Sequence, residues 1–197
     1  EDSSPIAALI FGDEIKNNAK KAIEALHQLG IRTAMISGDN KSSASRVGKI
    51  IGIDEVFAQV MPSDKAAIIK KLKTSKDNEG RQWVAMIGDG INDAPALAIA
   101  DVGMAMSTGT DVAIQSAGIT LMRGDLSLVP NAIDISKRTW RKIRQNLFWA
   151  FIFNTAGIPL AAFGYLSPMV AGSAMALSSF FVLSNALLLK RWHAKAF

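Results

Sequence analysis

Cysteine is absent from this chain of 197 residues. Its absence excludes disulfide bridges, zinc fingers and thiolate metal sites among these residues, and it leaves the redox compartment open. No secretory signal is expected, since residues 1–5 are polar and acidic and the apolar run after them is short. Internal repeats and low-complexity segments are also lacking, so ordinary globular patterning has to specify the fold.

Charge is missing from one long stretch. Between Gln145 and Leu189 the sequence has no Asp, Glu, Lys or Arg, whereas charged residues are spread through the first 144 positions. This stretch explains why the mean hydropathy, +0.21, is high for a purely soluble protein. We therefore expect a soluble part followed by a membrane part.

Basic residues give the chain a net charge of +5, which could indicate nucleic-acid binding. However, eight of them flank the uncharged stretch on its two sides: Lys137, Arg138, Arg141, Lys142, Arg144, Lys190, Arg191 and Lys195. The positive-inside rule produces this arrangement at the ends of membrane helices. The basicity therefore indicates membrane topology, and we expect no nucleic-acid partner.

Short apolar runs alternate with helical spacing before the membrane part. Strands are predicted over residues 6–11, 31–36, 56–58, 83–87, 102–106 and 119–122, and helices over residues 14–29, 41–51, 62–72, 94–100 and from 110 onward. The second helix should bury Ala44, Val47, Ile50 and Ile51, and the polar residues 74–81 should form an exposed loop. This alternation predicts an α/β fold with a doubly wound parallel sheet.

The densest motif covers residues 84–95, where an apolar run ends in Gly88-Asp89-Gly90 and Asp93 follows. A carboxylate at the carboxyl end of a parallel strand lies where such sheets bind ligands. Since Mg²⁺ prefers oxygen ligands, Asp89 is a candidate magnesium ligand. The structural alternative is a turn in which Asp93 caps a helix that begins at Ala94.

Two further joints fall at or just after the ends of strands: Ser37-Gly38-Asp39 and the segment around Lys65. The Ser37 hydroxyl and the Gly38 amide can bind phosphate oxygens, and Lys65 can neutralise charge on a transferred group. Together with Asp89 they indicate a phosphoryl-transfer site. Singly, Ser37 with Asp39 could be a helix N-cap, and Lys65 could simply be solvated.

These motifs resemble the haloacid dehalogenase-like phosphorylation domain of P-type ATPases. The residues that carry the resemblance are Ser37-Gly38-Asp39, 62–65 and 88–95, and it continues through 101–105 and 109–113 into the membrane part. It implies that ATP is the substrate and Mg²⁺ the cofactor. The implied catalytic residues are Ser37, Gly38, Asp39, Lys65, Asn92 and Asp93, with Asp89 and Asp93 binding the cofactor. Serine stands at position 37 where the family more often has threonine, and the hydroxyl is kept.

The resemblance also implies parts that these residues do not contain. The family's phosphorylated aspartate lies in an Asp-Lys-Thr-Gly-Thr motif, which the sequence lacks. A nucleotide-binding domain, an actuator domain and earlier transmembrane helices with a cysteine pair would be partners within the same pump. By themselves the present residues are not expected to form a phosphoenzyme, because the covalent acceptor is missing.

Two membrane helices are predicted over residues 147–167 and 169–189, each of 21 residues. This is close to the ~20 residues that span a ~30 Å hydrocarbon core. Positive charge at both outer ends predicts a hairpin whose two ends are cytoplasmic, with the turn near Ser167-Pro168 on the far side. The expected domains are therefore 1–128, a basic stalk helix over 129–146 that continues into the first span, and 147–197.

The candidate functional residues near the middle of the two spans are Asn154, Met175, Ser178 and Ser179. They could serve helix packing, or they could bind a transported metal, since a thioether selects Cu(I). Residues 175–179, followed by Asn185, are similar to the last helix of copper-transporting heavy-metal ATPases. In that subgroup a tyrosine usually precedes the asparagine, whereas Phe153 lacks the hydroxyl. The resemblance implies Cu⁺ as the transported ion, a lipid membrane and a copper chaperone as partners.

The favoured interpretation is the C-terminal part of an ATP-driven copper(I) export pump, a multi-pass membrane protein whose phosphorylation domain and C-terminus are cytoplasmic. One alternative is a non-catalytic, membrane-anchored piece that regulates or completes a pump. Others are a pump for another heavy metal and a soluble-type phosphatase, against which the uncharged hairpin argues. His27 and His193 are expected to be solvated surface residues.

Overall fold

The structure is a computed structural model that describes residues 15–77, 80–165 and 167–194. The strand predicted over residues 6–11 lies outside this range. Two compact units divide the chain between residues 128 and 129. Each unit is described by itself.

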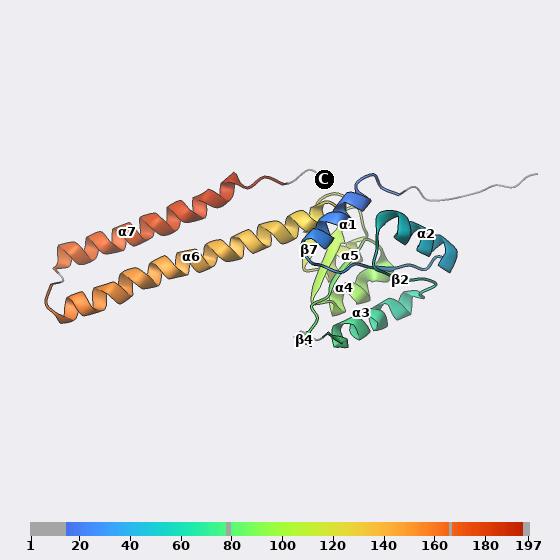
Figure 1. The fold of residues 1–197 in the computed structure, drawn as a ribbon, viewed down its shortest axis with the longest axis horizontal. Coiled ribbons are helices and arrows are strands. Elements are labelled where there is room, and N and C mark those ends of the chain that lie inside the picture. Colours follow the sequence, from blue (N-terminus) through green and yellow to red (C-terminus); the bar gives the residue numbers. More distant parts are fainter. Residues whose placement is uncertain (1–14, 78–79, 166, 195–197) are drawn as a thin grey trace, which may run out of the picture. The chain divides into compact units, whose positions relative to one another are not determined.

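Helices and strands alternate in the first unit (Figure 1). The elements are α1 (Ala19–Gln28), β1 (Ala34–Ile36), α2 (Lys41–Ile51), β2 (Glu55–Phe57), η1 (Pro62–Asp64), α3 (Lys65–Thr74), β3 (Lys76–Asp77), β4 (Gly80–Arg81), β5 (Ala85–Gly88), η2 (Ile91–Asp93), α4 (Ala94–Ile99), β6 (Val102–Met106), α5 (Asp111–Ser116) and β7 (Ile119–Leu121). The predicted alternation is confirmed, with the first helix beginning later than expected.

The sheet is parallel, as predicted, and falls into two parts. β1 pairs with β2, placing Met35 opposite Val56. β6 lies between β5 and β7, with Ile87 opposite Met104 and Met104 opposite Ile119. In the described part of the chain no ladder joins β1 to β5. The carboxyl ends of β1 and β5 both precede candidate site residues.

The prediction of an exposed loop over residues 74–81 is wrong. α3 extends through Thr74, and β3 and β4 form a short antiparallel pair in which Lys76 lies opposite Arg81. These strands have two residues each. Such short polar strands lack the apolar alternation by which strands are recognised in a sequence.

The buried face of α2 is narrower than predicted. Ala44, Gly48 and Ile51 are buried, whereas Ile50 is 52% exposed, so its predicted burial is wrong. Each residue turns the helix by about 100°, which places Ile50 beside the buried stripe rather than on it. A Cβ at Gly48 would lie 2.6 Å from the Val56 side chain, so the helix packs closely on β2.

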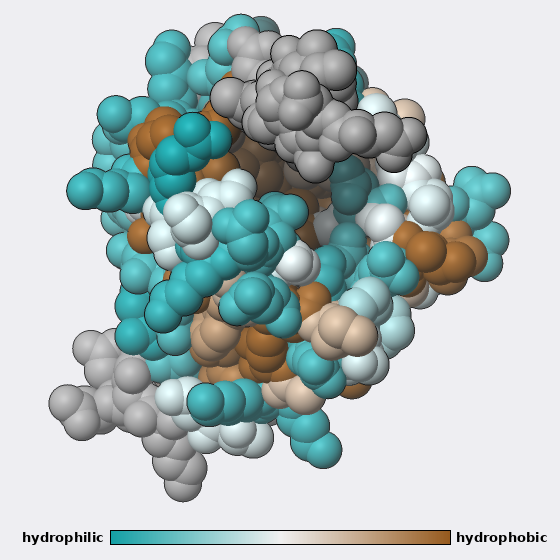
Figure 2. Space-filling model, turned by 90° about the vertical axis from the view of Figure 1, so that its right-hand side faces the viewer, coloured by the Kyte–Doolittle hydropathy of each residue, from teal (hydrophilic) through white to brown (hydrophobic). Residues whose placement is uncertain are grey.

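The core of the first unit packs against β5 and β6, and half of its buried cluster is alanine. Its buried cluster consists of Ile69, Met86, Ala96, Leu97, Ala105 and Ala113, and Ile36 from β1 packs against it. A Cβ at Gly103 would lie 2.5 Å from the Leu97 carbonyl oxygen. α4 therefore packs directly on β6. Because β6 pairs with β5, this packing also fixes the end of β5, after which the site begins. On the face shown in Figure 2, hydrophilic residues cover most of the described surface, with hydrophobic residues in separate patches.

The second unit is a helical hairpin in which α6 (Leu128–Ala162) and α7 (Pro168–Leu187) lie side by side, followed by η3 (Leu188–Arg191) (Figure 1). α6 runs without interruption, so the basic residues before position 145 and the apolar residues after it lie on one helix. It ends at Ala162 rather than at the predicted residue 167. Gly164 takes a left-handed φ of 76°, and Tyr165 donates its N–H to the Leu160 carbonyl oxygen at 2.9 Å, which closes the helix.

One helical segment in the described residues, Pro168–Arg191, is long and apolar enough to cross a membrane. This segment contains the second predicted span. The first predicted span has a shorter uncharged helical part, because α6 carries Arg144 and ends at Ala162. The uncharged part of α6 is residues 145–162, and its 18 residues are fewer than the ~20 that span a bilayer core without adjustment.

Candidate functional site

Asp89 stands directly after β5, at the carboxyl end of the strand. The residue is exposed, and its carboxylate has no hydrogen-bond or ion-pair partner among the residues that the structure describes. Its backbone is held firmly, because the Thr110 N–H donates to the Asp89 carbonyl oxygen at 2.8 Å. A fixed backbone with an open carboxylate is the arrangement that a metal ligand requires.

Three residues that the sequence did not mark as site residues position this loop. A Cβ at Gly109 would overlap the Asp89 carbonyl oxygen, and one at Gly88 would lie 2.6 Å from the Asp93 Cβ. Gly109 and Thr110 follow β6, the neighbour of β5. The signal available in the sequence was a Gly-Thr pair after the adjacent strand, at the same edge of the sheet.

Asp93 differs from Asp89 in that both of its oxygens are engaged. Oδ1 accepts from Lys65 Nζ at 2.7 Å, and Oδ2 accepts from the Gly90 N–H at 3.1 Å. The side chains of Lys65 and Asp93 are only 17% and 11% exposed. The alternative of a solvated Lys65 is therefore wrong. Asp93 reaches back to η2 and makes no side-chain capping bond to α4, so the capping alternative is also wrong.

Ser37, Gly38 and Asp39 form a compact turn after β1. The Ser37 hydroxyl donates to Asp39 Oδ2 at 2.7 Å, and the Asp39 N–H donates to Ser37 Oγ at 3.1 Å. The N-cap of α2 is Asn40, which accepts from the Ser43 N–H at 2.8 Å, so the capping alternative for Ser37 and Asp39 is wrong. Gly38 is exposed, which leaves room for a ligand to approach its backbone.

The structure assembles part of the predicted site directly. It joins Lys65 to Asp93 and ties Asp89 to the loop after β6. Within the described ranges, no hydrogen bond or ion pair links Ser37, Gly38 or Asp39 to those residues, and Asn92 is exposed with no hydrogen bond from its side chain. β1 and β5 both contribute to the core, because Ile36 of β1 packs against the buried cluster that contains Met86 of β5.

The donor set at β5 fits a hard cation bound partly by water. Asp89 offers an open carboxylate, and Asp93 lies in the same loop. Among the described residues, no group of three or more His, Cys, Asp or Glu side chains gathers to hold a metal, either here or in another part of the fold. Mg²⁺ usually keeps several waters and takes only one or two protein carboxylates. The residues present therefore fit magnesium.

The predicted metal ligands of the hairpin do not form a cluster between α6 and α7. Asn154 is exposed and donates from Nδ2 to the Ala150 carbonyl oxygen at 2.8 Å. Ser179 is exposed and donates to the Met175 carbonyl oxygen at 3.0 Å, while Met175 is 71% exposed. Ser178 is half-buried. The amide and hydroxyl of Asn154 and Ser179 are satisfied by their own helices, and the thioether of Met175 remains open.

Phe153 takes part in an aromatic stack between the helices instead. Its ring lies 6.1 Å from that of Phe181, which stacks on Trp149 with centroids 5.5 Å apart. The phenylalanine that replaces the subgroup's tyrosine thus contributes packing across the hairpin.

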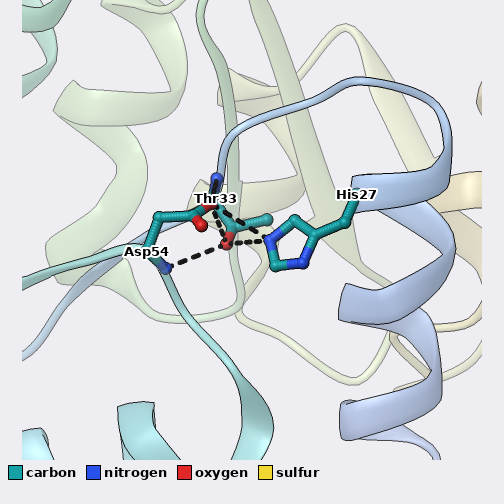
Figure 3. Close-up of polar contacts among 3 residues, drawn as sticks. All are labelled: His27, Thr33 and Asp54. Carbon is teal, nitrogen blue, oxygen red and sulfur yellow. Dashed lines mark hydrogen bonds and ion pairs between the residues drawn. The ribbon is translucent and has the colours of Figure 1, made fainter.

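His27 is exposed, as predicted, and its ring is also held by hydrogen bonds (Figure 3). Its Nε2 lies 3.0 Å from Asp54 Oδ2 and 3.0 Å from Thr33 Oγ1. Asp54 also accepts from the Thr33 N–H at 2.7 Å. The cluster joins α1 to the loops before β1 and β2. Both partners meet the same ring nitrogen, so this is a structural clip rather than a relay through the imidazole. His193 is exposed, as predicted.

Two carboxyl groups have shifted pKa values. The backbone N–H of Thr33, aided by its hydroxyl and by His27, lowers the pKa of Asp54 from its usual 3.8. The backbone N–H of Ser127, which lies 2.9 Å from Asp125 Oδ1, lowers the pKa of Asp125. Hydrogen bonds to a charged carboxylate favour the ionised form. Both shifts therefore describe loop structure.

Known proteins similar to this chain are metal-transporting ATPases. Copper-exporting P-type ATPase of Staphylococcus aureus strain bovine RF122 / ET3-1 is 58% identical over 93% of the chain, and that of strain JH9 is 56% identical over the same share. The match covers 22% of either relative, so the chain spans about a fifth of their length.

Solved structures of metal-transporting ATPases are also similar to this chain. A zinc-transporting PIB-type ATPase in the E2.Pi state is 32% identical, with a TM-score of 0.81 over 91% of this chain and 28% of that one. The catalytic CPx-ATPase domain CopB-B is 37% identical, with a TM-score of 0.52 over 60% of this chain and 45% of that one. The haloacid dehalogenase-like hydrolase family matches residues 3–101. Half of the chain, including β1, β5 and the loops after them, is thus matched, and the chain belongs to the haloacid dehalogenase-like hydrolase family.

Proposed function

We propose that this chain is the C-terminal part of an ATP-driven copper(I) export pump. The observation that carries the proposal is the open Asp89 carboxylate at the end of β5, held by Gly109 and Thr110 and set beside the buried Lys65–Asp93 pair. Identity of 58% to a copper-exporting P-type ATPase supports the choice of cargo.

The residues after β5 and β1 would divide the phosphoryl chemistry. Asp89 would hold Mg²⁺, with Asp93 and Asn92 ordering the loop. When bound, this ion would neutralise charge on the phosphoryl oxygens. The Ser37 hydroxyl and the Gly38 N–H would donate to phosphoryl oxygens, and Asp39 would orient Ser37 through the bond of 2.7 Å. Lys65, already aimed into the site by Asp93, would stabilise charge that develops on the transferred group.

The nucleophile has to come from elsewhere in the polypeptide. An aspartate in an Asp-Lys-Thr-Gly-Thr motif would attack the γ-phosphorus of ATP, form the acyl phosphate and release ADP. A nucleotide-binding domain would deliver the ATP, and an actuator domain would direct water to the acyl phosphate. The residues described above would supply the electrostatic part of both steps.

The hairpin would belong to the transport path. The exposed faces of α6 and α7 lie outside the contact between the two helices and carry Met175, Asn154 and Ser179. These faces can therefore meet earlier helices of the same pump. A thioether is a soft ligand that suits Cu(I), and amide and hydroxyl oxygens would assist. Ser178 lies at the edge of this face. Both helices would cross the membrane, the first with local thinning of the bilayer, with the sheet unit and the C-terminus in the cytoplasm.

The complete polypeptide in inside-out vesicles tests the function. Cu(I), delivered by a chaperone or a thiol buffer, should stimulate ATP hydrolysis and accumulate in the vesicles. ATP hydrolysis that is independent of copper, together with no uptake, would contradict the proposal.

Zinc is the second candidate cargo, since a zinc-transporting structure has a TM-score of 0.81 to the chain. The same vesicles should be tested with Zn²⁺ at matched free concentration. Uptake of zinc but not of copper would identify zinc as the transported ion. The proposal for the phosphoryl site would then stand unchanged. No uptake and no phosphorylation with either metal would favour the non-catalytic, membrane-anchored piece.

A further inference from the structure

Three polar side chains join α6 to α7 at one end of the hairpin. Lys142 donates from Nζ to Asn185 Oδ1 at 2.6 Å, and Asn185 donates from Nδ2 to Asn146 Oδ1 at 2.7 Å. Both contacts are partly buried, and both ends of the Asn185 amide are used. The phosphoryl site and the metal ligands considered so far do not use these residues.

The three residues belong to the seam along which the two helices pack. Half-buried positions on α6 from residue 139 onward recur at intervals of three and four: Thr139, Lys142, Asn146, Ala150, Phe153 and Gly157. On the facing helix they include Ala171, Ala174, Ser178, Val182 and Asn185. This spacing is that of a left-handed helix pair. Asn146 and Asn185 are therefore polar residues at one end of a seam whose positions nearer the turn are small or apolar.

A polar pair in such a seam selects one alignment of the helices. A shift of α7 by one turn would move Asn185 away from Asn146 and toward Trp149, whose ring now stacks on Phe181. The amide and the ammonium group would then lose their partners in a place with little water, which costs free energy. Paired asparagines in helix pairs fix register for this reason.

We propose that Lys142, Asn146 and Asn185 form a register clamp, which sets the rotation and shift of α7 against α6 and thereby positions Met175 and Ser179 relative to Asn154. At about 1.5 Å per residue, Asn146 lies roughly 12 Å along α6 from Asn154, and Asn185 roughly 9 Å along α7 from Ser179. The clamp is thus two turns or so from the proposed ligands on each helix. Its effect on metal binding rests on the proposed function, whereas its effect on register does not.

Cysteine cross-linking in the complete polypeptide tests the register directly. Counting eleven residues along each helix from the facing pair Asn146 and Asn185 puts Gly157 opposite Ala174, both half-buried. The pair Gly157→Cys and Ala174→Cys should cross-link readily under mild oxidation. Adding Asn185→Leu should reduce the yield at least severalfold, and Asn185→Gln, which keeps both hydrogen-bonding groups, should restore much of it. Ser173→Leu, a polar-to-leucine change at an exposed position of α7, is the matched control and should leave the yield unchanged.

The same variants without the cysteine pair test the positioning role. Asn185→Leu should raise the Cu(I) concentration for half-maximal ATPase activation about tenfold, while phosphorylation from inorganic phosphate in the absence of metal stays near wild type. Unchanged cross-linking in Asn185→Leu would overturn the clamp. Reduced cross-linking with unchanged copper activation would overturn its positioning role. If Cu(I) does not activate the wild-type ATPase, the proposed function fails. The cross-linking yields alone then test the clamp.

Discussion

The two units of this chain hold their functional side chains in opposite ways. In the first unit, Asp89 and Asp93 are fixed by backbone contacts with glycines and by a buried lysine. In the second, Asn154 and Ser179 hydrogen-bond to their own helices on exposed faces, and Met175 is open. The proposed phosphoryl site has its geometry from local packing, whereas the proposed metal ligands of the hairpin have no surrounding site in these residues.

This difference shows which part of each site is built by these residues. A phosphoryl site needs donors and a metal ligand at fixed positions, and the sheet edge provides them. A transport site between membrane helices needs several helices at once, and a hairpin supplies one wall. Changes in the first unit should therefore disturb geometry sharply, while changes in the second should alter affinity more gently.

Apart from the loss of Asp89 itself, the largest effect is expected from Lys65→Met, which would leave the buried Asp93 carboxylate without its cation. Phosphorylation of the complete polypeptide by ATP should fall on the order of 10²–10³-fold, and stability should drop by about 2 kcal/mol. Rapid-quench labelling and thermal unfolding measure the two. Lys65→Met with Asp93→Asn should recover stability but not phosphorylation. Recovery of both would mean that Lys65 acts only as a structural partner, and Lys70→Met, at an exposed site, is the control.

Gly109→Ala should come next. The new Cβ would overlap the backbone of Asp89, and a displacement of about 1 Å near the reacting groups can cost on the order of 100-fold in rate. Phosphorylation at saturating Mg²⁺ measures the effect. Gly118→Ala is the matched change in the same unit, since the nearest atom lies 4.0 Å away, and it should be nearly silent. Equal rates for both variants would show that the Asp89 loop tolerates movement.

A smaller effect is expected from Met175→Leu in the second unit. Leucine keeps the apolar volume but removes the thioether, so the fold should persist while the Cu(I) concentration for half-activation rises about tenfold. Copper-stimulated ATPase titrations measure it, with Met169→Leu, at the exposed start of α7, as control. Unchanged activation would favour packing over metal binding for Met175.

The smallest effect should come from the clip at His27. Because the folded pKa of Asp54 is lowered, its stabilising contribution is complete above the usual value of 3.8 and disappears as pH falls through the lower folded pKa. Asp54→Asn should therefore lower stability slightly at neutral pH and leave the protein less sensitive to acid below about pH 4. Parallel unfolding curves for variant and wild type across this pH window would contradict the assignment.

Sequence patterns were sufficient to predict those elements whose structure depends on nearby residues alone. The parallel strands that end at Ile36 and Gly88 follow apolar runs, and Gly30 and Gly52 take the left-handed conformations expected after helices. The motifs that resemble those of P-type ATPases supplied the candidate residues of the site.

Contacts between distant segments could not be predicted in the same way. The pairing of His27 with Asp54 depends on how two loops meet, and the contact of Gly109 with Asp89 depends on which strand lies next to β5. The early end of α6 depends on Gly164, whose small size carries little weight in hydropathy. The clamp at Asn185 becomes visible only once the register of the hairpin is known.

Magnesium-dependent phosphorylation of an Asp89→Asn variant tests the central claim most directly. The complete polypeptide should be incubated with ATP, Mg²⁺ and Cu(I), and acid-stable phosphoprotein should be measured, with Glu55→Gln as a control for loss of an exposed carboxylate. If the open carboxylate holds the cation, Asp89→Asn should yield no phosphoprotein above background and Glu55→Gln should match the wild type. Acid-stable phosphoprotein at wild-type levels in Asp89→Asn would contradict the account.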